Sequence, residues 1–217
     1  MSIARISAGI LPLCLLALAL TGCSTGGGTA GVALNGNGNN AASRFTPNYG
    51  AAVTFQRWDH FPIKVAFTND VSVSGTSLRS VVLAGFDKWV TATGGVIGYT
   101  VVTDPATADM PITFQNLGAT PGKGDTLGLT TRTYFPSTLQ ITSVAMSLNY
   151  WPTMTGAQAF QGLKSTAAHE FGHALGIVGH SPNSDDIMFL SGSINGDDKA
   201  VTTRDLNTIK SDYDSLF

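Results

Sequence analysis

Two histidines four residues apart, with the chain's single glutamate between them, constrain this sequence more than any other feature. His169 and His173 project from one face of a helix about one turn apart, so both can bind a single metal ion. Glu170 lies roughly 100° round the helix from His169, where a carboxylate is suited to hold a water molecule rather than the metal. The segment therefore predicts a helix that carries a metal centre and a general base.

The residues around these histidines have the period of an amphipathic helix. At ~100° per residue, the half that faces away from the histidines is apolar, so we expect it to pack. Its members are Leu163, Ala167, Ala168, Phe171, Ala174 and Leu175. The histidine side carries small residues, which we expect to leave room for a metal and a substrate. They are Gly162, Ser165, Thr166, Gly172 and Gly176.

A third metal ligand is expected shortly after this helix. Gly176 can adopt a positive φ, which ends a helix and turns the chain sharply, and His180 follows four residues later. Three imidazoles and one open position are typical of a catalytic zinc site, because a structural site is closed by four protein ligands. Asp185 or Asp186 is the alternative third ligand. A glutamate ligand is excluded because the chain has no second glutamate.

This segment resembles the zinc-binding sequence of the metzincin peptidases, and within them the matrixin-like group. The family pattern is H-E-x-x-H-x-x-G-x-x-H, and four of its positions match: His169, Glu170, His173 and Gly176. Gly179 stands where the third histidine is expected, and His180 follows one residue late. We interpret residues 177–179 as a loop that is one residue longer than in the family.

The resemblance extends to a Met-containing turn at residues 184–189. It implies that Met188 lies beneath the metal as a packing residue, not as a ligand. Some metzincins have a metal-binding tyrosine two residues further on; Leu190 stands there, so that ligand is not expected. The implied fold is α+β: a twisted mixed β-sheet of about five strands with three helices, in which a Met-turn follows the active-site helix.

Hydrophobic patterning predicts the elements that precede the motif. Strands are expected at 63–67, 97–102, 111–114, 127–131 and 141–148, and helices at about 78–91 and after residue 202. Ser77, Thr155 and Thr202 are the expected N-caps of the three helices. His60 has no spacing that relates it to the other histidines, and we interpret it as a structural or surface residue.

Leu127, Gly128 and Leu129 resemble, by their position, the edge strand that borders the active-site cleft of matrixin-like domains. An exposed edge can pair with an extended peptide by main-chain hydrogen bonds. An ordinary edge strand or loop is the alternative. The resemblance also implies that residues between Met188 and Asp205 form one wall of the specificity pocket.

The first part of the chain has the composition of an export signal. Residues 1–22 contain one basic residue and an apolar run, and they end before Cys23 in a sequence that resembles the bacterial lipobox. The resemblance implies a diacylated Cys23; an ordinary cleaved signal is the alternative. Residues 23–50 are rich in Gly and Asn and are expected to form a flexible tether, with the catalytic domain at 51–217.

Charge and cysteine content narrow the expected partners and location. A net charge of −2 gives no electrostatic case for binding nucleic acid or an anionic membrane surface. Both cysteines, Cys14 and Cys23, precede the expected catalytic domain, so the folded domain has no disulfide. We expect a monomer that is anchored by lipid in the bacterial cell envelope, faces the periplasm or exterior, and contacts the membrane only through that anchor.

These expectations combine in a zinc-dependent endopeptidase that acts on protein or peptide substrates, with one catalytic Zn²⁺ and Glu170 as general base. Calcium is not claimed, since the loop at 122–125 offers too few ligands. Two alternatives stay open: a lipid-anchored zinc-binding protein without turnover, and a hydrolase of cell-wall peptides.

Overall fold

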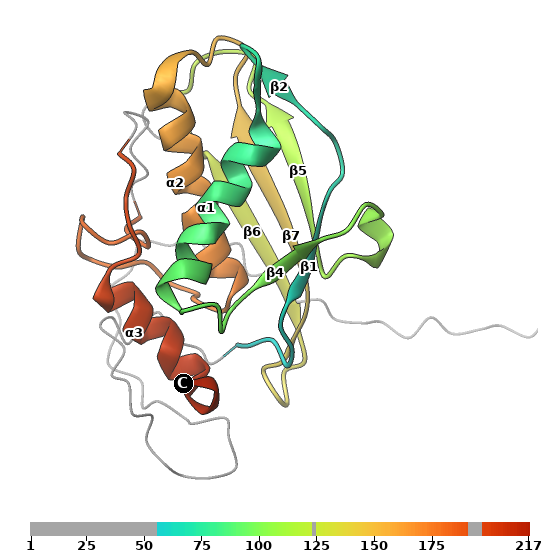
Figure 1. The fold of residues 1–217 in the computed structure, drawn as a ribbon, viewed down its shortest axis with the longest axis vertical. Coiled ribbons are helices and arrows are strands. Elements are labelled where there is room, and N and C mark those ends of the chain that lie inside the picture. Colours follow the sequence, from blue (N-terminus) through green and yellow to red (C-terminus); the bar gives the residue numbers. More distant parts are fainter. Residues whose placement is uncertain (1–55, 123–124, 191–196) are drawn as a thin grey trace, which may run out of the picture.

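The computed structural model describes residues 56–122, 125–190 and 197–217. The expected signal peptide, Cys23 and the tether lie outside these ranges. Within them, one β-sheet carries two long helices on one face, and a third helix lies near the C-terminal end of the second (Figure 1).

The sheet has five strands in the order β4-β1-β5-β7-β6. β1 pairs in parallel with β4 and β5, and β5 pairs in parallel with β7, whereas β6 is antiparallel to β7. The strands are β1 (Ile63–Phe67), β4 (Tyr99–Val101), β5 (Met110–Asn116), β6 (Gly128–Tyr134) and β7 (Ile141–Tyr150). The expected α+β class with a mixed five-stranded sheet is confirmed.

Three α-helices and several short elements complete the described fold. The helices are α1 (Leu78–Ala92), α2 (Gly156–Ala174) and α3 (Thr203–Asp212). A small antiparallel hairpin leads into α1, and single helical turns follow β4 and α3. These are β2 (Ser72–Val73), β3 (Thr76–Ser77), η2 (Pro105–Thr107) and η3 (Asp214–Leu216). α2 ends where the sequence expects it to, just before Gly176.

The two long helices approach each other closely at Gly85 of α1. A Cβ atom there would lie 3.0 Å from the Cβ of Ala167 and would also collide with the carbonyl oxygen of Lys164. Glycine is therefore required for this contact. The close approach lets the rings of Phe86 and Phe171 stack with centroids 4.3 Å apart, and Trp89 Nε1 donates to the carbonyl oxygen of Ala168 at 2.7 Å.

The apolar half of α2 is buried as the sequence predicts. Five of its six members are fully inaccessible and Leu163 is 5% exposed. Burying one such large side chain stabilises the fold by roughly 1.5–3 kcal/mol. Packing of this face against α1 and the sheet therefore fixes the rotation of α2 about its axis, and with it the direction of the histidines.

Of the three expected N-cap residues, one makes a capping hydrogen bond with its side chain, at the start of α3. Thr202 accepts from the backbone N–H of Asp205, whose carboxylate accepts from the N–H of Thr202, which is a complete capping box. Ser77 and Thr155 occupy the N-cap positions, but their side chains make no capping hydrogen bond. Ser77 is committed to β3, and Gly156, with φ of 75°, turns the chain at the start of α2.

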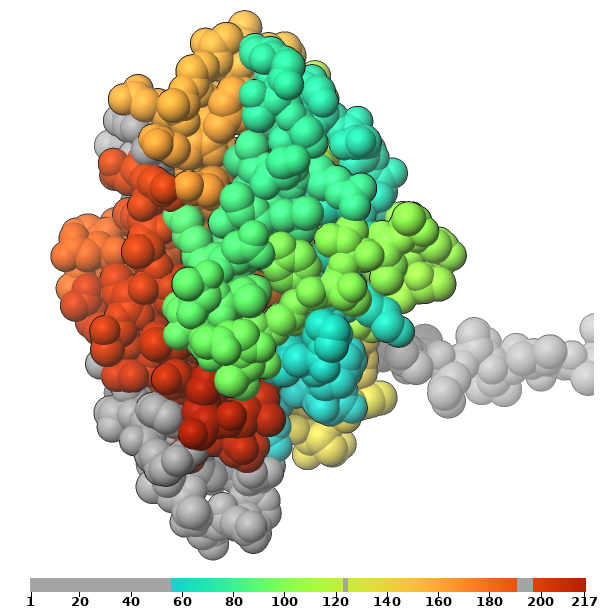
Figure 2. Space-filling view, viewed as in Figure 1, coloured from blue at the N-terminus to red at the C-terminus, as the bar shows by residue number. Residues whose placement is uncertain are grey.

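The surface in Figure 2 shows α1 in the middle of the view with the C-terminal segment beside it. Among the described residues, we find no helix with both the length and the apolar composition that a bilayer crossing requires.

Candidate active site

Three histidine side chains converge at the C-terminal end of α2. One ring nitrogen from each of His169, His173 and His180 lies within 4.8 Å of the other two. Nε2 of His173 and Nε2 of His180 are 3.3 Å apart. Zinc bound tetrahedrally at about 2.0–2.1 Å separates its ligand nitrogens by about 3.4 Å. The separation of these two nitrogens therefore fits a shared zinc ion.

Backbone carbonyls fix the orientation of the two helical histidines. Nδ1 of His169 lies 2.8 Å from the carbonyl oxygen of Ile187, and Nδ1 of His173 lies 2.7 Å from that of Ile177. A carbonyl oxygen only accepts, so Nδ1 carries the proton in both rings. Each Nε2 is then left with a free lone pair, the arrangement expected of histidine metal ligands.

The surroundings keep all three imidazoles neutral near pH 7. Burial lowers the pKa of His169 to about 4. Burial also lowers the pKa of His173 well below its ordinary value, with a further lowering from the charge of His169, and it lowers the pKa of His180. Only the neutral ring can bind a metal ion, so the site is preset for that role.

The chain reaches His180 through the turn predicted at Gly176. Its φ is 125°, and a Cβ atom there would collide with the carbonyl oxygen of Gln56. Ser181 then anchors the loop after the histidine, since its N–H donates to the carbonyl oxygen of Met188 at 2.8 Å. The extra residue before His180 is thus accommodated in a loop that is fixed at both ends.

The small residues of the histidine side do not all serve the purpose expected from the sequence. A Cβ atom on Gly172 would lie 2.8 Å from Cζ2 of Trp89 and would overlap the sulfur of Met188. Gly172 and Gly176 therefore make room for protein atoms, not for a metal or substrate. The expectation was wrong for Gly172 because Met188 and Trp89 fill the space beside it, and for Gly176 because the backbone at Gln56 passes against it. A helical projection does not show either contact.

Met188 is fully buried against α2 at Gly172. The turn that carries it is held by Asp205 of α3, whose carboxylate accepts from the N–H of Ile187 at 3.0 Å and from that of Met188 at 3.4 Å. Ile187 in turn accepts from His169. From the sequence, Asp205 is expected only as the limit of the pocket wall. Its support of the histidine through the turn depends on contacts distant in sequence.

The alternative third ligands lie elsewhere. Asp186 is buried and forms an ion pair with Arg204 at 2.6 Å, and it also accepts from Ser181 and Thr202. Asp185 is exposed. Among the described residues, the three histidines form the group that is close enough together to share a metal ion. Neither aspartate belongs to this group, so the aspartate alternative is not supported.

Glu170 lies beside this cluster and is 6% exposed. Its Oε2 accepts a hydrogen bond from Thr130 Oγ1 at 2.7 Å. Burial raises the pKa of Glu170 to about 7, although the hydrogen bond from Thr130 and the charge of Arg132 both act to lower it. A carboxylate with this pKa can take up and release a proton near neutral pH.

The chain matches a known protein family. The matrixin peptidase family profile matches residues 26–214. The chain is a matrixin. Matrixins are zinc-dependent metallopeptidases, and their substrates are peptides or proteins. The fold and the three-histidine group fit that assignment. Among curated proteins, none matches the chain closely enough to add a relative to the comparison.

The edge strand expected in this matrixin is β6. In the described residues, β6 pairs with β7 on one side and with no strand on the other. Leu127 immediately precedes it, Gly128 begins it, and Leu129 is 50% exposed. Gly128 lies directly against the Glu170 side chain, so the strand borders this carboxylate.

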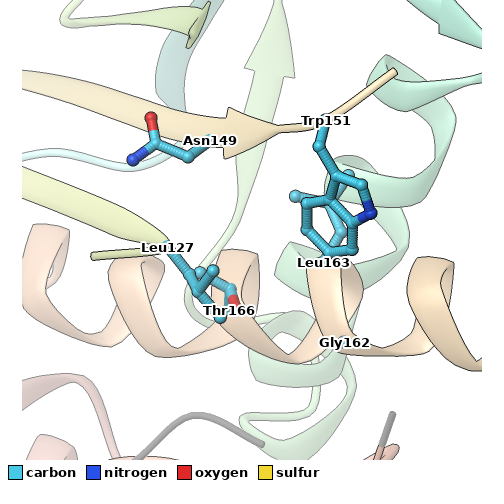
Figure 3. Close-up of a pocket in the computed structure, with 6 residues that line it drawn as sticks. All are labelled: Leu127, Asn149, Trp151, Gly162, Leu163 and Thr166. Carbon is cyan, nitrogen blue, oxygen red and sulfur yellow. The ribbon is translucent and has the colours of Figure 1, made fainter. Parts of the chain in front are cut away.

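An apolar pocket opens between β6, the end of β7 and the first half of α2 (Figure 3). Its lining residues are Leu127, Asn149, Trp151, Gly162, Leu163 and Thr166. Thr166 stands one turn before His169 in this matrixin, so the pocket adjoins the histidine cluster. The pocket wall expected between Met188 and Asp205 includes residues 191–196, which lie outside the described ranges.

His60 takes no part in the cluster of this matrixin. Its Nδ1 contacts Asp59 at 2.6 Å and its Nε2 contacts Asp109 at 3.2 Å. The hydrogen bond with Asp59 raises the pKa of His60, against the lowering effect of burial. This agrees with its interpretation as a structural or surface residue.

Proposed function

We propose that this protein is a zinc-dependent endopeptidase in which His169, His173 and His180 hold one Zn²⁺ and Glu170 is the general base. The observation that carries the proposal is the convergence of three neutral imidazoles beside a buried carboxylate. Three histidine ligands leave a zinc ion one open position, which is the arrangement of catalytic zinc sites.

The bound ion supplies Lewis-acid chemistry, since zinc makes water more acidic and polarises a carbonyl group. Glu170 accepts the proton of the attacking water on its carboxylate and delivers it to the leaving amine. Ile187 and Ile177 hold His169 and His173 in the tautomer that presents Nε2 to the site. Burial of the cluster excludes competing protonation of the rings.

The substrate is an extended peptide that pairs with the free edge of β6. Main-chain hydrogen bonds along such an edge recognise the backbone and leave the side chains to neighbouring pockets. Leu127 and Leu163 line a small apolar hollow beside this edge. A peptide bound in this way runs past the catalytic groups, because Gly128 of β6 contacts Glu170.

The test compares wild type with Glu170→Gln. We expect both to bind one zinc per chain by metal analysis, and the variant to cleave casein about 10²- to 10⁴-fold more slowly, the usual contribution of a general base. His60→Gln is the matched control and should retain full activity. Wild-type cleavage by Glu170→Gln would refute the proposed role. Zinc binding by wild type without cleavage of any peptide would favour a binding protein instead.

We also propose that the protein is anchored through a lipidated Cys23 in the bacterial cell envelope. The lipobox-like sequence before Cys23 supports this. Labelling cells with a radioactive fatty acid should mark the wild type, and Cys23→Ser should lose the label and leave the membrane fraction. Retention of the label in Cys23→Ser would contradict the proposal.

A further inference from the structure

The inner face of β6 lies along α2 at the catalytic residues. Alternate residues of the strand are half-buried toward the helix: Gly128, Thr130 and Arg132. Gly128 packs on Glu170, Thr130 hydrogen-bonds it, and Arg132 donates to the carbonyl oxygen of His173. The residues between them, Leu129 and Thr131, face outward and are exposed. One face of β6 therefore packs against α2.

Thr130 makes its closest contact with the carboxylate of Glu170. Its Oγ1 lies 2.7 Å from Oε2 and 3.1 Å from the backbone carbonyl oxygen of the same residue. A hydroxyl has a single proton to donate. The shorter contact is with the carboxylate, and hydrogen bonds to an ionised acceptor are the stronger kind. The hydroxyl therefore donates its proton to the carboxylate in preference to the backbone carbonyl oxygen.

Gly128 restrains the Glu170 side chain at a second point. A Cβ atom on Gly128 would lie 2.6 Å from Cγ and 2.8 Å from Oε1 of Glu170. The side chain thus rests on the bare backbone of β6 while its Oε2 is held by Thr130. Within the described residues, Oε1 has no hydrogen-bond partner. One carboxylate oxygen is held and the other is left for proton transfer.

We propose that Thr130 is a positioning residue of the reaction, whose hydroxyl fixes Oε2 of Glu170 and directs Oε1 toward the reacting water. The inference rests on the proposed role of Glu170 as general base. A base whose carboxylate can rotate away spends less time in the reactive geometry, so loss of the hydroxyl lowers the rate of chemistry and not the binding of substrate or zinc.

The decisive variant is Thr130→Val, which keeps the shape of the side chain and removes the hydroxyl. We expect kcat on a fluorogenic peptide to fall about 10- to 100-fold, the range that misplacement of a catalytic group produces. KM and the zinc dissociation constant, measured by competition with a chromophoric chelator, should stay within about twofold, as purely positional effects require. Thr130→Ser keeps the hydroxyl and should recover most of kcat.

Thr142→Val is the matched control, since Thr142 is an exposed threonine of β7 whose hydroxyl donates to the backbone carbonyl oxygen of Thr133 and not to Glu170. It should behave as wild type. Equal kcat for Thr130→Val and Thr142→Val overturns the inference, and so does a tenfold loss of zinc affinity in Thr130→Val. If circular dichroism shows that valine disturbs folding, Thr130→Ala is used with the same expectations.

A double variant shows whether Thr130 acts through the carboxylate. Thr130→Val should slow Glu170→Gln no further, because the hydroxyl then has no base to orient. A further tenfold loss overturns the inference. The two hypotheses fail in different ways. An inactive wild type, or a fully active Glu170→Gln, would refute the proposed function. If wild type is active and Glu170→Gln is not, but Thr130→Val retains its kcat, only the Thr130 inference is refuted.

Discussion

Arg132 Nη1 donates to the carbonyl oxygen of Ile177 at 3.2 Å, and the same oxygen accepts from Nδ1 of His173 at 2.7 Å. Nη1 also contacts the carbonyl oxygen of His173, and Nε donates to Gln56 at 2.9 Å. A cation on β6 thus holds the last turn of α2 and the loop that leads to His180. Outer contacts of this kind set how well a histidine is oriented for its metal.

Replacing Arg132 should therefore weaken zinc binding. Arg132→Met keeps the length of the side chain and removes its donors, and we expect a zinc dissociation constant about 10- to 100-fold higher, as is usual for lost outer-shell partners. Competition with a chelator measures it. Lys64→Met removes a cation from an exposed site on β1 and serves as control. Unchanged zinc affinity in Arg132→Met would show that Ile177 orients His173 unaided.

Gly128→Ala should lower activity by displacing Glu170. The new methyl group would come within 2.6 Å of its Cγ, so the side chain or the strand must move. We expect kcat/KM to fall about tenfold or more, since small displacements of catalytic groups have large effects. Gly98→Ala is the control, because no atom lies within 4 Å of its added Cβ. Similar kcat/KM values for the two variants would disprove the close contact.

Asp212→Asn should stabilise the protein in a pH-dependent way. Asp212 is buried and neither carboxylate oxygen has a hydrogen-bond partner in the described structure. Burial raises the pKa of Asp212 well above its ordinary value, although the charges of Arg57 and Arg132 oppose this. A raised folded-state pKa means that the ionised form destabilises the fold increasingly as pH rises above the unfolded value of about 3.9.

The gain from Asp212→Asn should thus be near zero at pH 4 and about 1–3 kcal/mol at pH 8, since the amide removes the buried charge and each pKa unit between the folded and unfolded states contributes about 1.4 kcal/mol. Urea denaturation at the two pH values measures it. Asp70→Asn, at an exposed position, should show no such trend. A gain that is equal at both pH values would mean that the carboxylate is not the source of the destabilisation.

Gly172→Ala should destabilise the domain because its methyl group competes with Met188 and Trp89 for the same space. Overpacking of a filled core costs about 1–3 kcal/mol. Thermal unfolding of the zinc-loaded protein measures the loss, with Gly98→Ala again as control. An unchanged melting temperature would show that the Met188 side chain can move aside without cost.

Individual helices and strands could be predicted because the spacing of apolar residues within each segment depends on neighbouring residues alone. The strand expected at 63–67 is β1, and the apolar half of α2 is buried as expected. The strand expected at 97–102 is shorter, since Ile97 is buried and its N–H donates to Thr93 Oγ1, which continues the end of α1. Such a local competition between strand and cap is not visible in the alternation of residue types.

The three histidines and the glutamate could be identified because the motif spacing encodes them. Thr130 and Arg132 could not. They contact Glu170 and His173 across about forty positions of sequence, and their neighbours in β6 follow no pattern that distinguishes inner from outer residues. Only the register of β6 against β7 and its closeness to α2 assign Thr130 to the inside and Thr131 to the outside.

The alternation along β6 also sets how this enzyme can be redesigned. Gly128, Thr130 and Arg132 on the inner face of the strand contact Glu170 and the end of α2, whereas Leu129, Thr131 and Thr133 point away from them. A library that varies these outward positions alone can alter which peptides are accepted while leaving the chemistry intact. Randomising the whole strand would destroy turnover in most clones.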